Sequence, residues 1–259
     1  VSLLASLNQS ADMSVGNVLG SNLFNILVIV GLCAMFCPIS VSRTTITRDI
    51  PFVILSSLVL AVVSLDVLVD GSASNVITRV EGLTMLLFFA VFMFYTMAIS
   101  SSGEESDTQP MPLWLSLLWI VVGIASLVGG GHLFVDGATD VAHALGVSEL
   151  VIGMTIMAGG TSLPELAASL VAARKGRSAM AIGNVIGSNV FNVFFVLGLC
   201  CTVTPMEVEN LSLADISMLV LSAFMFWFFA RSHYAVRRWE GCVMFVAYVL
   251  YIIYKVCVA

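Results

Sequence analysis

Long stretches with few charged side chains run through this sequence, and they restrict its fold more than any other feature. Eight such stretches cover approximately residues 14–37, 50–69, 80–100, 113–135, 147–173, 179–204, 212–230 and 241–258. A helix needs about 20 apolar residues to cross the hydrocarbon core of a bilayer. The sequence therefore predicts an all-α integral membrane protein, in which residues 1–7 form the end of a preceding helix.

The composition excludes a soluble globular domain. Of the 259 residues, 59% are hydrophobic and 10% are charged, whereas about 25% of residues in ordinary soluble domains are charged. The formal net charge is −6, and no basic tract offers a surface for a phosphate backbone. We therefore expect a lipid bilayer as the surroundings and no nucleic acid as a partner.

Basic side chains mark alternate loops of the predicted helices. They are Arg43 and Arg48, then Arg174, Lys175 and Arg177, then Arg231, Arg237 and Arg238. Cytoplasmic loops of membrane proteins carry an excess of Lys and Arg, so we place these loops inside. The intervening loops, 136–149 and 207–215, hold acidic residues without Lys or Arg and are expected outside.

The sequence contains an internal repeat. GNVLGSNLFN at residues 16–25 recurs as GNVIGSNVFN at residues 183–192, and RVEG at 79–82 recurs as RWEG at 238–241. The loop before the first copy is uncharged at residues 7–10, while the loop before the second carries three basic residues at 174–177. The two copies are therefore expected to have opposite orientations, which is typical of secondary transporters. We divide the chain into a first repeat (1–100), a cytoplasmic linker (101–112) and a second repeat (113–259).

A predicted helix of the second repeat is interrupted at residues 158–165, AGGTSLPE. Glycine loosens a helix, and proline removes a backbone donor. We expect carbonyl groups near Ala158 to lose their helical partners and attract a cation. Glu165 adds a carboxylate in a membrane segment, where ionisable residues usually mark ion pathways. Thr161 and Ser162 precede it by four and three residues and can share its helical face.

The repeated motif supplies two further pairs of oxygen donors, each four residues apart. They are Ser21 with Asn25 and Ser188 with Asn192. Small and polar residues can instead pack membrane helices against one another. We assign this packing role to the glycines Gly16, Gly20, Gly183 and Gly187, and the ligand role to the two Ser/Asn pairs.

Oxygen donors without imidazole or thiolate favour hard cations such as Na⁺ and Ca²⁺. A single carboxylate leaves a dehydrated divalent ion with excess charge, so a second acid is expected opposite Glu165. Subtracting the repeat offset of 167 (Gly16 to Gly183) from 165 places that acid three positions before Val1.

The segments GTSLPE (160–165), AARKG (172–176) and GNVIGSNVFN (183–192) resemble the second α-repeat of the sodium/calcium exchanger family, and residues 1–38 resemble the latter part of its first. The resemblance implies ten helices in two inverted repeats of five, with helix 1 and most of helix 2 missing from this chain. It implies an antiporter of the bacterial or archaeal inner membrane that exchanges Na⁺ for Ca²⁺ at central sites.

The same resemblance implies roles for individual residues. Glu165 would bind both ions, and the other ligands would be Thr161, Ser162, Ser188, Ser21, Asn25 and the carbonyl group of Ala158. Asn192 would lie near the midplane, where some relatives carry Asp. The first helix of each half, here 113–135, would slide across the helices at 80–100 and 241–258.

Three other transport functions are the alternatives. They are Ca²⁺/H⁺ exchange, K⁺-dependent Na⁺/Ca²⁺ exchange and a cation channel. Proton-coupled relatives usually carry an acid after a Gly-Asn pair, whereas Gly183-Asn184 is followed by Val185. The histidines are scattered and no hydrolase motif is present, so we expect neither an enzyme nor a cofactor.

Overall fold

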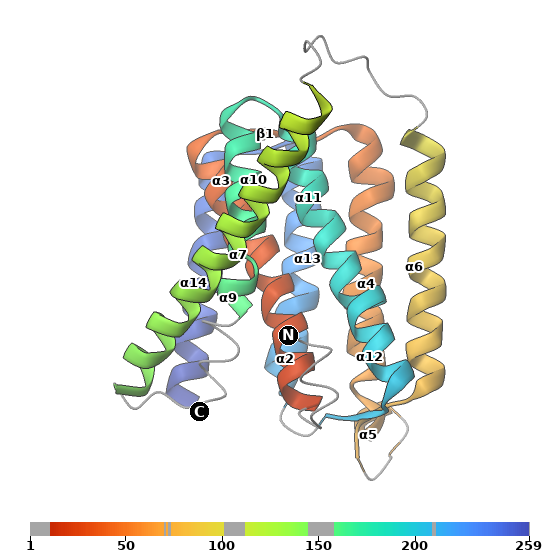
Figure 1. The fold of residues 1–259 in the computed structure, drawn as a ribbon. Coiled ribbons are helices and arrows are strands. Elements are labelled where there is room, and N and C mark those ends of the chain that lie inside the picture. The colour runs from red at the N-terminus through yellow and green to blue at the C-terminus, as the bar shows by residue number, and fades with distance from the viewer. Residues whose placement is uncertain are drawn as a thin grey trace.

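The computed structural model of the chain describes residues 11–69, 71, 74–100, 112–144, 158–208 and 211–258. Long helices make up most of the molecule and form one bundle (Figure 1). Among the described residues, six helical segments are long and apolar enough to cross a membrane: Ser14–Phe36, Thr45–Val63, Arg79–Ala98, Ser178–Val203, Leu213–His233 and Arg238–Cys257. The predicted class, an all-helical multi-pass membrane protein, is confirmed.

The first half of the chain consists of helices joined by short turns and two short strands. Its elements are α2 (Ala11–Leu23), the π-helix η1 (Phe24–Val30), α3 (Gly31–Phe36), β1 (Ile39–Ser40), the π-helix η2 (Thr45–Asp49), α4 (Ile50–Val63), α5 (Asp66–Val69), β2 (Val76–Ile77) and α6 (Arg79–Ser100).

The second half repeats most of this order. Its elements are α7 (Leu113–Ala144), α9 (Ala158–Thr161), α10 (Leu163–Arg174), α11 (Ser178–Val190), the π-helix η4 (Phe191–Leu197), α12 (Gly198–Val203), β3 (Met206–Glu207), α13 (Leu213–His233), β4 (Ala235–Val236) and α14 (Arg238–Val258).

The two copies of the repeated motif adopt the same structure in opposite directions. Helices α2, η1 and α3 correspond to α11, η4 and α12, and each boundary is shifted by 167 residues (Ala11 to Ser178, Phe24 to Phe191). In Figure 1, α2 lies low and α3 high, whereas α11 lies high and α12 low. The inverted repeat predicted from loop charges is therefore present in the fold.

Short strand pairs join the two repeats at the ends of the bundle. Strand β1 pairs antiparallel with β4, with Ile39 opposite Val236, and β2 pairs with β3, with Ile77 opposite Met206. Because β1 and β3 occupy the same position in their repeats, the two pairs are related by the pseudo-two-fold symmetry. Each pair contains one strand from each repeat, so neither repeat forms these strand pairs without the other.

The repeats also exchange helix contacts. Helix α3 of the first repeat packs on α14 of the second, and α12 of the second packs on α6 of the first. Glycine permits this close approach at both crossings. A Cβ atom added to Gly241 would lie 2.5 Å from the carbonyl oxygen of Gly31, and one added to Gly82 would lie 2.8 Å from that of Gly198. The backbones are thus in direct contact.

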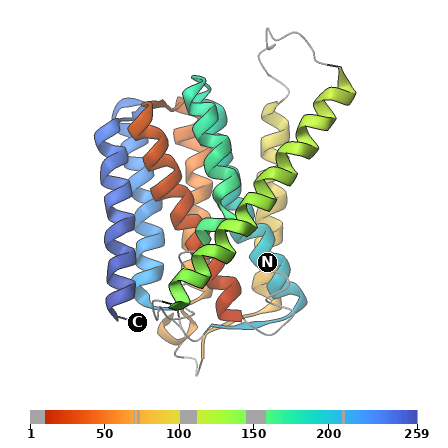
Figure 2. The same ribbon diagram turned by 60° about the vertical axis from the view of Figure 1, so that its left-hand side comes forward.

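Helix α7 lies at an oblique angle to the other helices, and Figure 2 shows it crossing in front of them. Its main contacts are with α9 and α10. A Cβ atom added to Gly123, Gly129 or Gly130 would meet no described atom within 4 Å. The helix therefore has much looser packing than α6 and α14.

Some predicted spans differ from the observed helices at their ends. The span expected at 50–69 ends at Val63, because Ser64 leaves helical geometry (φ −102°, ψ 4°), and a separate short helix follows. The side chain of Asp66 accepts a hydrogen bond from the backbone N–H of Val76 at 2.9 Å, which holds this turn against β2. The span expected at 113–135 continues to Ala144. Charge counting could not locate these ends, because they depend on local side-chain contacts.

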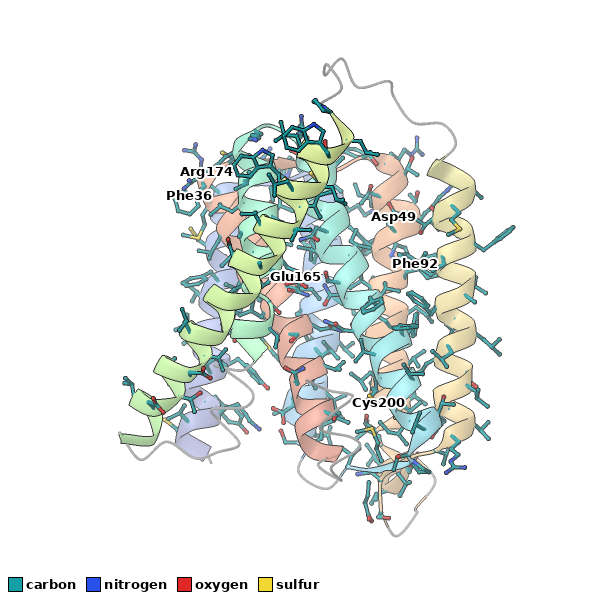
Figure 3. All side chains as sticks on the ribbon, in the orientation of Figure 1. Phe36, Asp49, Phe92, Glu165, Arg174 and Cys200 are labelled. Carbon is teal, nitrogen blue, oxygen red and sulfur yellow. The ribbon has the colours of Figure 1, made fainter. Side chains whose placement is uncertain are left out.

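Most basic side chains gather at the end of the bundle that carries β1 and β4. Eight of the ten are exposed there, namely Arg43, Arg48, Arg174, Lys175, Arg177, Arg231, Arg237 and Arg238. The guanidinium of Arg174 lies 5.4 Å above the ring of Phe36, and Figure 3 shows both at this end. The positive-inside rule assigns this end to the cytoplasm.

A buried ion pair lies in the second repeat, at the end of the bundle opposite to the basic side chains. The ammonium of Lys255 donates to Oδ2 of Asp215 at 2.9 Å, and the hydroxyl of Tyr251 donates to Oδ1 at 2.7 Å. Asp215 also forms a capping box with Ser212 at the start of α13. The carboxylate is fully buried, and its several donors offset the cost of removing it from water.

The glycine contacts predict opposite effects for matched alanine substitutions. Gly82→Ala and Gly241→Ala place a methyl group against backbone atoms that cannot move aside, so each should destabilise the protein by ~1–3 kcal/mol. Gly123→Ala, on the loosely packed α7, should leave stability unchanged. Thermal unfolding of the purified proteins in detergent tests this, and equal melting temperatures for all three variants would contradict the close packing.

The ion pair predicts a non-additive effect on stability. Removing one partner, in Asp215→Asn or Lys255→Met, leaves the other buried without a counter-charge and should cost ~3–5 kcal/mol. The double variant removes both charges and should recover much of this loss. The test measures the unfolding midpoints of the two single variants and of the double variant and asks whether the two single losses add up. Additive losses would show that the two charges do not interact.

Candidate cation site

The interrupted helix is observed where the sequence predicts it. Helices α9 and α10 meet at Ser162, which leaves helical geometry (φ −98°, ψ 3°), and Pro164 lies in the first turn of α10. One expectation is wrong in detail. The backbone N–H of Ser162 donates to the carbonyl of Gly159 at 3.1 Å, so this carbonyl is not left without a partner. The tight turn satisfies it locally.

Glu165 lies in the first turn of α10, near mid-height of the bundle in Figure 3. Its Oε2 atom is buried and has no hydrogen-bond partner among the described residues. A buried carboxylate oxygen without a donor is costly unless a ligand or a proton satisfies it. This atom is therefore suited to bind a cation.

Glu165 opens onto a cleft of about 410 Å³. The lining residues are Glu165, Gly183, Asn184, Gly187, Ser188, Phe191 and Asn192. The structure thus brings together three predicted ligands, Glu165, Ser188 and Asn192. Among the described residues, a Cβ atom added to Gly183 or Gly187 would meet nothing within 4 Å, so the packing role predicted for these glycines finds no neighbour there. Without side chains, these glycines leave room for the cleft instead.

The remaining predicted ligands lie around the junction of the repeats. The hydroxyl groups of Ser21 and Thr161 are 3.3 Å apart and join the two repeats directly. The helix breaks at Ser162, which is buried, between Thr161 and Glu165. Asn25 is also buried, and its Oδ1 atom has no partner among the described residues.

Ala158 begins α9. Its carbonyl group therefore belongs to the short helix before the break.

Both asparagines of the predicted pairs lie in π-helical segments. Asn25 is in η1 and Asn192 is in η4, each the second residue of its segment. A π-helix has a wider turn than an α-helix, and such segments are frequent at functional sites. Ser188 and Asn192, four residues apart, both line the cleft. The sequence carries no simple signal for the π-helical turns.

Three other asparagines of the repeated motif belong to the site, although the sequence analysis gave them no role. The amide of Asn184 donates to the carbonyl of Glu165 at 3.2 Å and to the hydroxyl of Ser169 at 2.9 Å. It thereby holds α11 against the start of α10. Asn22 and Asn189 are buried where the repeats meet. Their recurrence at the repeat offset was the available signal.

The polar side chains that line this cleft are a carboxylate, a hydroxyl and two amides, and they lie beside the ring of Phe191. Across the described part of the chain, no three His, Cys, Asp or Glu side chains are close enough to hold a metal ion together. The donor set is that of a hard cation, bound by carboxylate, hydroxyl and amide oxygens. The second carboxylate expected opposite Glu165 falls on a position outside the given sequence and stays a prediction.

Comparison with known proteins identifies close relatives of this arrangement. The family model described as sodium/calcium exchanger protein matches residues 1–98 and 115–257. The putative antiporter CaxA of Alkalimonas amylolytica is 35% identical over 97% of this chain and 81% of its own length. The inner membrane protein YrbG of Escherichia coli (strain K12) is 35% identical over 87% of the chain and 71% of its own length.

Solved structures of the sodium-calcium exchanger NCX_Mj have the same fold. The structure soaked with 2.5 mM Na⁺ and 1 mM Sr²⁺ superimposes with a TM-score of 0.79 at 31% sequence identity. The match covers 97% of this chain and 79% of that chain.

The orphaned oxygen of Glu165 predicts that Ca²⁺ stabilises the protein. A ligand that binds only the folded state raises its stability with concentration, so millimolar Ca²⁺ should raise the melting temperature of the wild type. Glu165→Gln should abolish this rise, because the amide removes the charge. Glu207→Gln is the matched control, since Glu207 is exposed in β3 and distant from the cleft. Equal Ca²⁺ stabilisation in both variants would exclude Glu165 as a ligand.

Proposed function

The chain belongs to the sodium/calcium exchanger family, and from this premise we propose that it is a secondary active antiporter that exchanges Na⁺ for Ca²⁺. One observation carries the proposal. A buried carboxylate oxygen of Glu165 has no hydrogen-bond partner in the part of the chain that the structure describes, and it lies beside a cleft that Ser188 and Asn192 also line. An unpaired acid inside a membrane protein is a functional site by default, and the oxygen donors around it suit both ions.

In this proposal the two ions share their ligands. Glu165 binds Ca²⁺ and Na⁺ in turn, and the neighbouring oxygens of Thr161, Ser162, Ser188, Asn192, Ser21, Asn25 and the Ala158 carbonyl complete the sites. Ca²⁺ takes six to eight oxygens in irregular geometry, which a set drawn from two repeats can supply. Because both ions use the carboxylate, they exclude each other, and this competition couples their movements.

Alternating access would place the site in contact with one side of the membrane at a time. Helices α6 and α14 are held to the opposite repeats by backbone contact at Gly82 and Gly241. They are suited to remain fixed. Helix α7 is loosely packed and contacts mainly α9 and α10, which flank the site. We propose that α7 moves across this frame when the carboxylate is neutralised by bound ions, in the manner of inverted-repeat transporters.

The experiment is Ca²⁺ uptake into proteoliposomes. The protein, expressed from its full reading frame, is reconstituted into vesicles loaded with Na⁺ and diluted into Na⁺-free medium containing ⁴⁵Ca²⁺. Uptake should require the outward Na⁺ gradient and should disappear in Glu165→Gln, while Glu207→Gln retains it. The two variants remove the same charge, so a difference between them locates the site rather than an effect on net charge.

Other gradients distinguish the alternatives. Uptake driven by a pH gradient without Na⁺ would indicate Ca²⁺/H⁺ exchange, and a requirement for K⁺ as well as Na⁺ would indicate K⁺-dependent exchange. Uptake that ignores every gradient and saturates only at channel-like rates would indicate a cation channel. Full transport by Glu165→Gln would overturn the proposed site.

A further inference from the structure

Asn22 is a buried side chain for which the transport site has so far given no role. It lies in the repeated motif between the predicted ligands Ser21 and Asn25, and it is only 1% exposed. A buried carboxamide is costly unless its donor and acceptor are both satisfied. Its partners therefore reveal what it does.

The nitrogen of Asn22 crosses to the other repeat. Nδ2 of Asn22 donates a hydrogen bond to the backbone carbonyl of Asn189 at 3.3 Å. A backbone carbonyl can only accept. This contact therefore decides which way the Asn22 amide is turned, and it leaves Oδ1 of Asn22 on the other side of the group.

That oxygen in turn fixes a residue of the cleft. Oδ1 of Asn22 accepts a hydrogen bond from Nδ2 of Asn192 at 3.1 Å. Because Asn22 presents an acceptor, Asn192 must present its nitrogen. The oxygen of Asn192 then points away from Asn22, and Asn192 lines the cleft beside Glu165. An inverted amide would bring N–H groups toward a cation and repel it.

The corresponding asparagine of the second repeat does not act in this way. Asn189 is related to Asn22 by the repeat offset, but its Nδ2 donates to the carbonyl of Val185 in its own helix at 2.8 Å. The side-chain amides of these two buried asparagines therefore donate to different kinds of partner, one in the opposite repeat and one in its own helix. Only Asn22, of this pair, reaches a side chain of the opposite repeat that faces the cleft.

We propose that Asn22 is a positioning residue that turns the oxygen of Asn192 toward the transported cation, through a chain running from the Asn189 carbonyl to Asn22 to Asn192. This rests on the proposed cation site and adds to it a residue that does not touch the ion. It also explains how a neutral carboxamide can serve as a ligand at position 192, since its orientation is imposed by the opposite repeat.

A double-mutant cycle tests this role. Ca²⁺ dissociation constants are measured by titration calorimetry in Na⁺-free buffer for the wild type, Asn22→Leu, Asn192→Leu and the double variant, with Asn22→Ala as a second variant if leucine prevents folding. Residues that orient a metal ligand contribute about 10–100-fold in affinity. We expect Asn22→Leu to weaken Ca²⁺ binding by about tenfold and the double variant to bind no more weakly than Asn192→Leu alone.

The outcomes separate this role from a structural one. Equal weakening by Asn22→Leu in the wild-type and Asn192→Leu backgrounds would show that Asn22 acts independently of Asn192 and would overturn the proposal. A loss of melting temperature without a change in Ca²⁺ affinity would do the same. Gradient-driven uptake by the wild type is measured in parallel, so that tight Ca²⁺ binding without uptake contradicts the antiporter but leaves the role of Asn22 intact. Wild-type protein that binds no Ca²⁺ would overturn both.

Discussion

Two glycine pairs bring the backbones of the two repeats into contact, Gly31 against Gly241 and Gly82 against Gly198. Van der Waals packing drives helix association in a bilayer, because lipid tails are as apolar as the side chains, and small residues allow the closest approach. Helix α3 of the first repeat thereby packs on α14 of the second, and α12 of the second repeat packs on α6 of the first. The strand pairs at the two ends follow from the same exchange. The repeats consequently form one unit rather than two adjacent bundles.

This exchange of contacts determines where polar groups can be buried. Two asparagines of the repeated motif, Asn22 and Asn192, are joined by a hydrogen bond across the boundary between the repeats. The hydroxyl groups of Ser21 and Thr161 also meet there. A membrane interior offers no water to such groups, so each must find a partner in the protein or bind a ligand. The oxygens of Glu165 and Asn25, which have no partner among the described residues, are therefore the natural positions for cations.

Much of the fold followed from the sequence, because membrane spans are long and their composition is extreme. The inverted repeat was also predictable, since an internal repeat and the loop charges together specify opposite orientations. The finer geometry was not. No local pattern indicated the π-helical segments that hold Asn25 and Asn192. Among the described residues, Gly183 and Gly187 line a cleft, and what lies opposite a glycine depends on the neighbouring helices.

The sequence by itself determined the solvent, the helical class, the duplication and the carboxylate at Glu165, because each depends on composition or on a repeated pattern. Only the tertiary structure decided which oxygens meet. Ser188 and Asn192 join Glu165 at the cleft, while Asn22 orients Asn192 from the other repeat. Residues 22 and 192 are 170 positions apart in the chain, and hydrogen bonds across such a distance depend on how the helices cross, which no local pattern encodes.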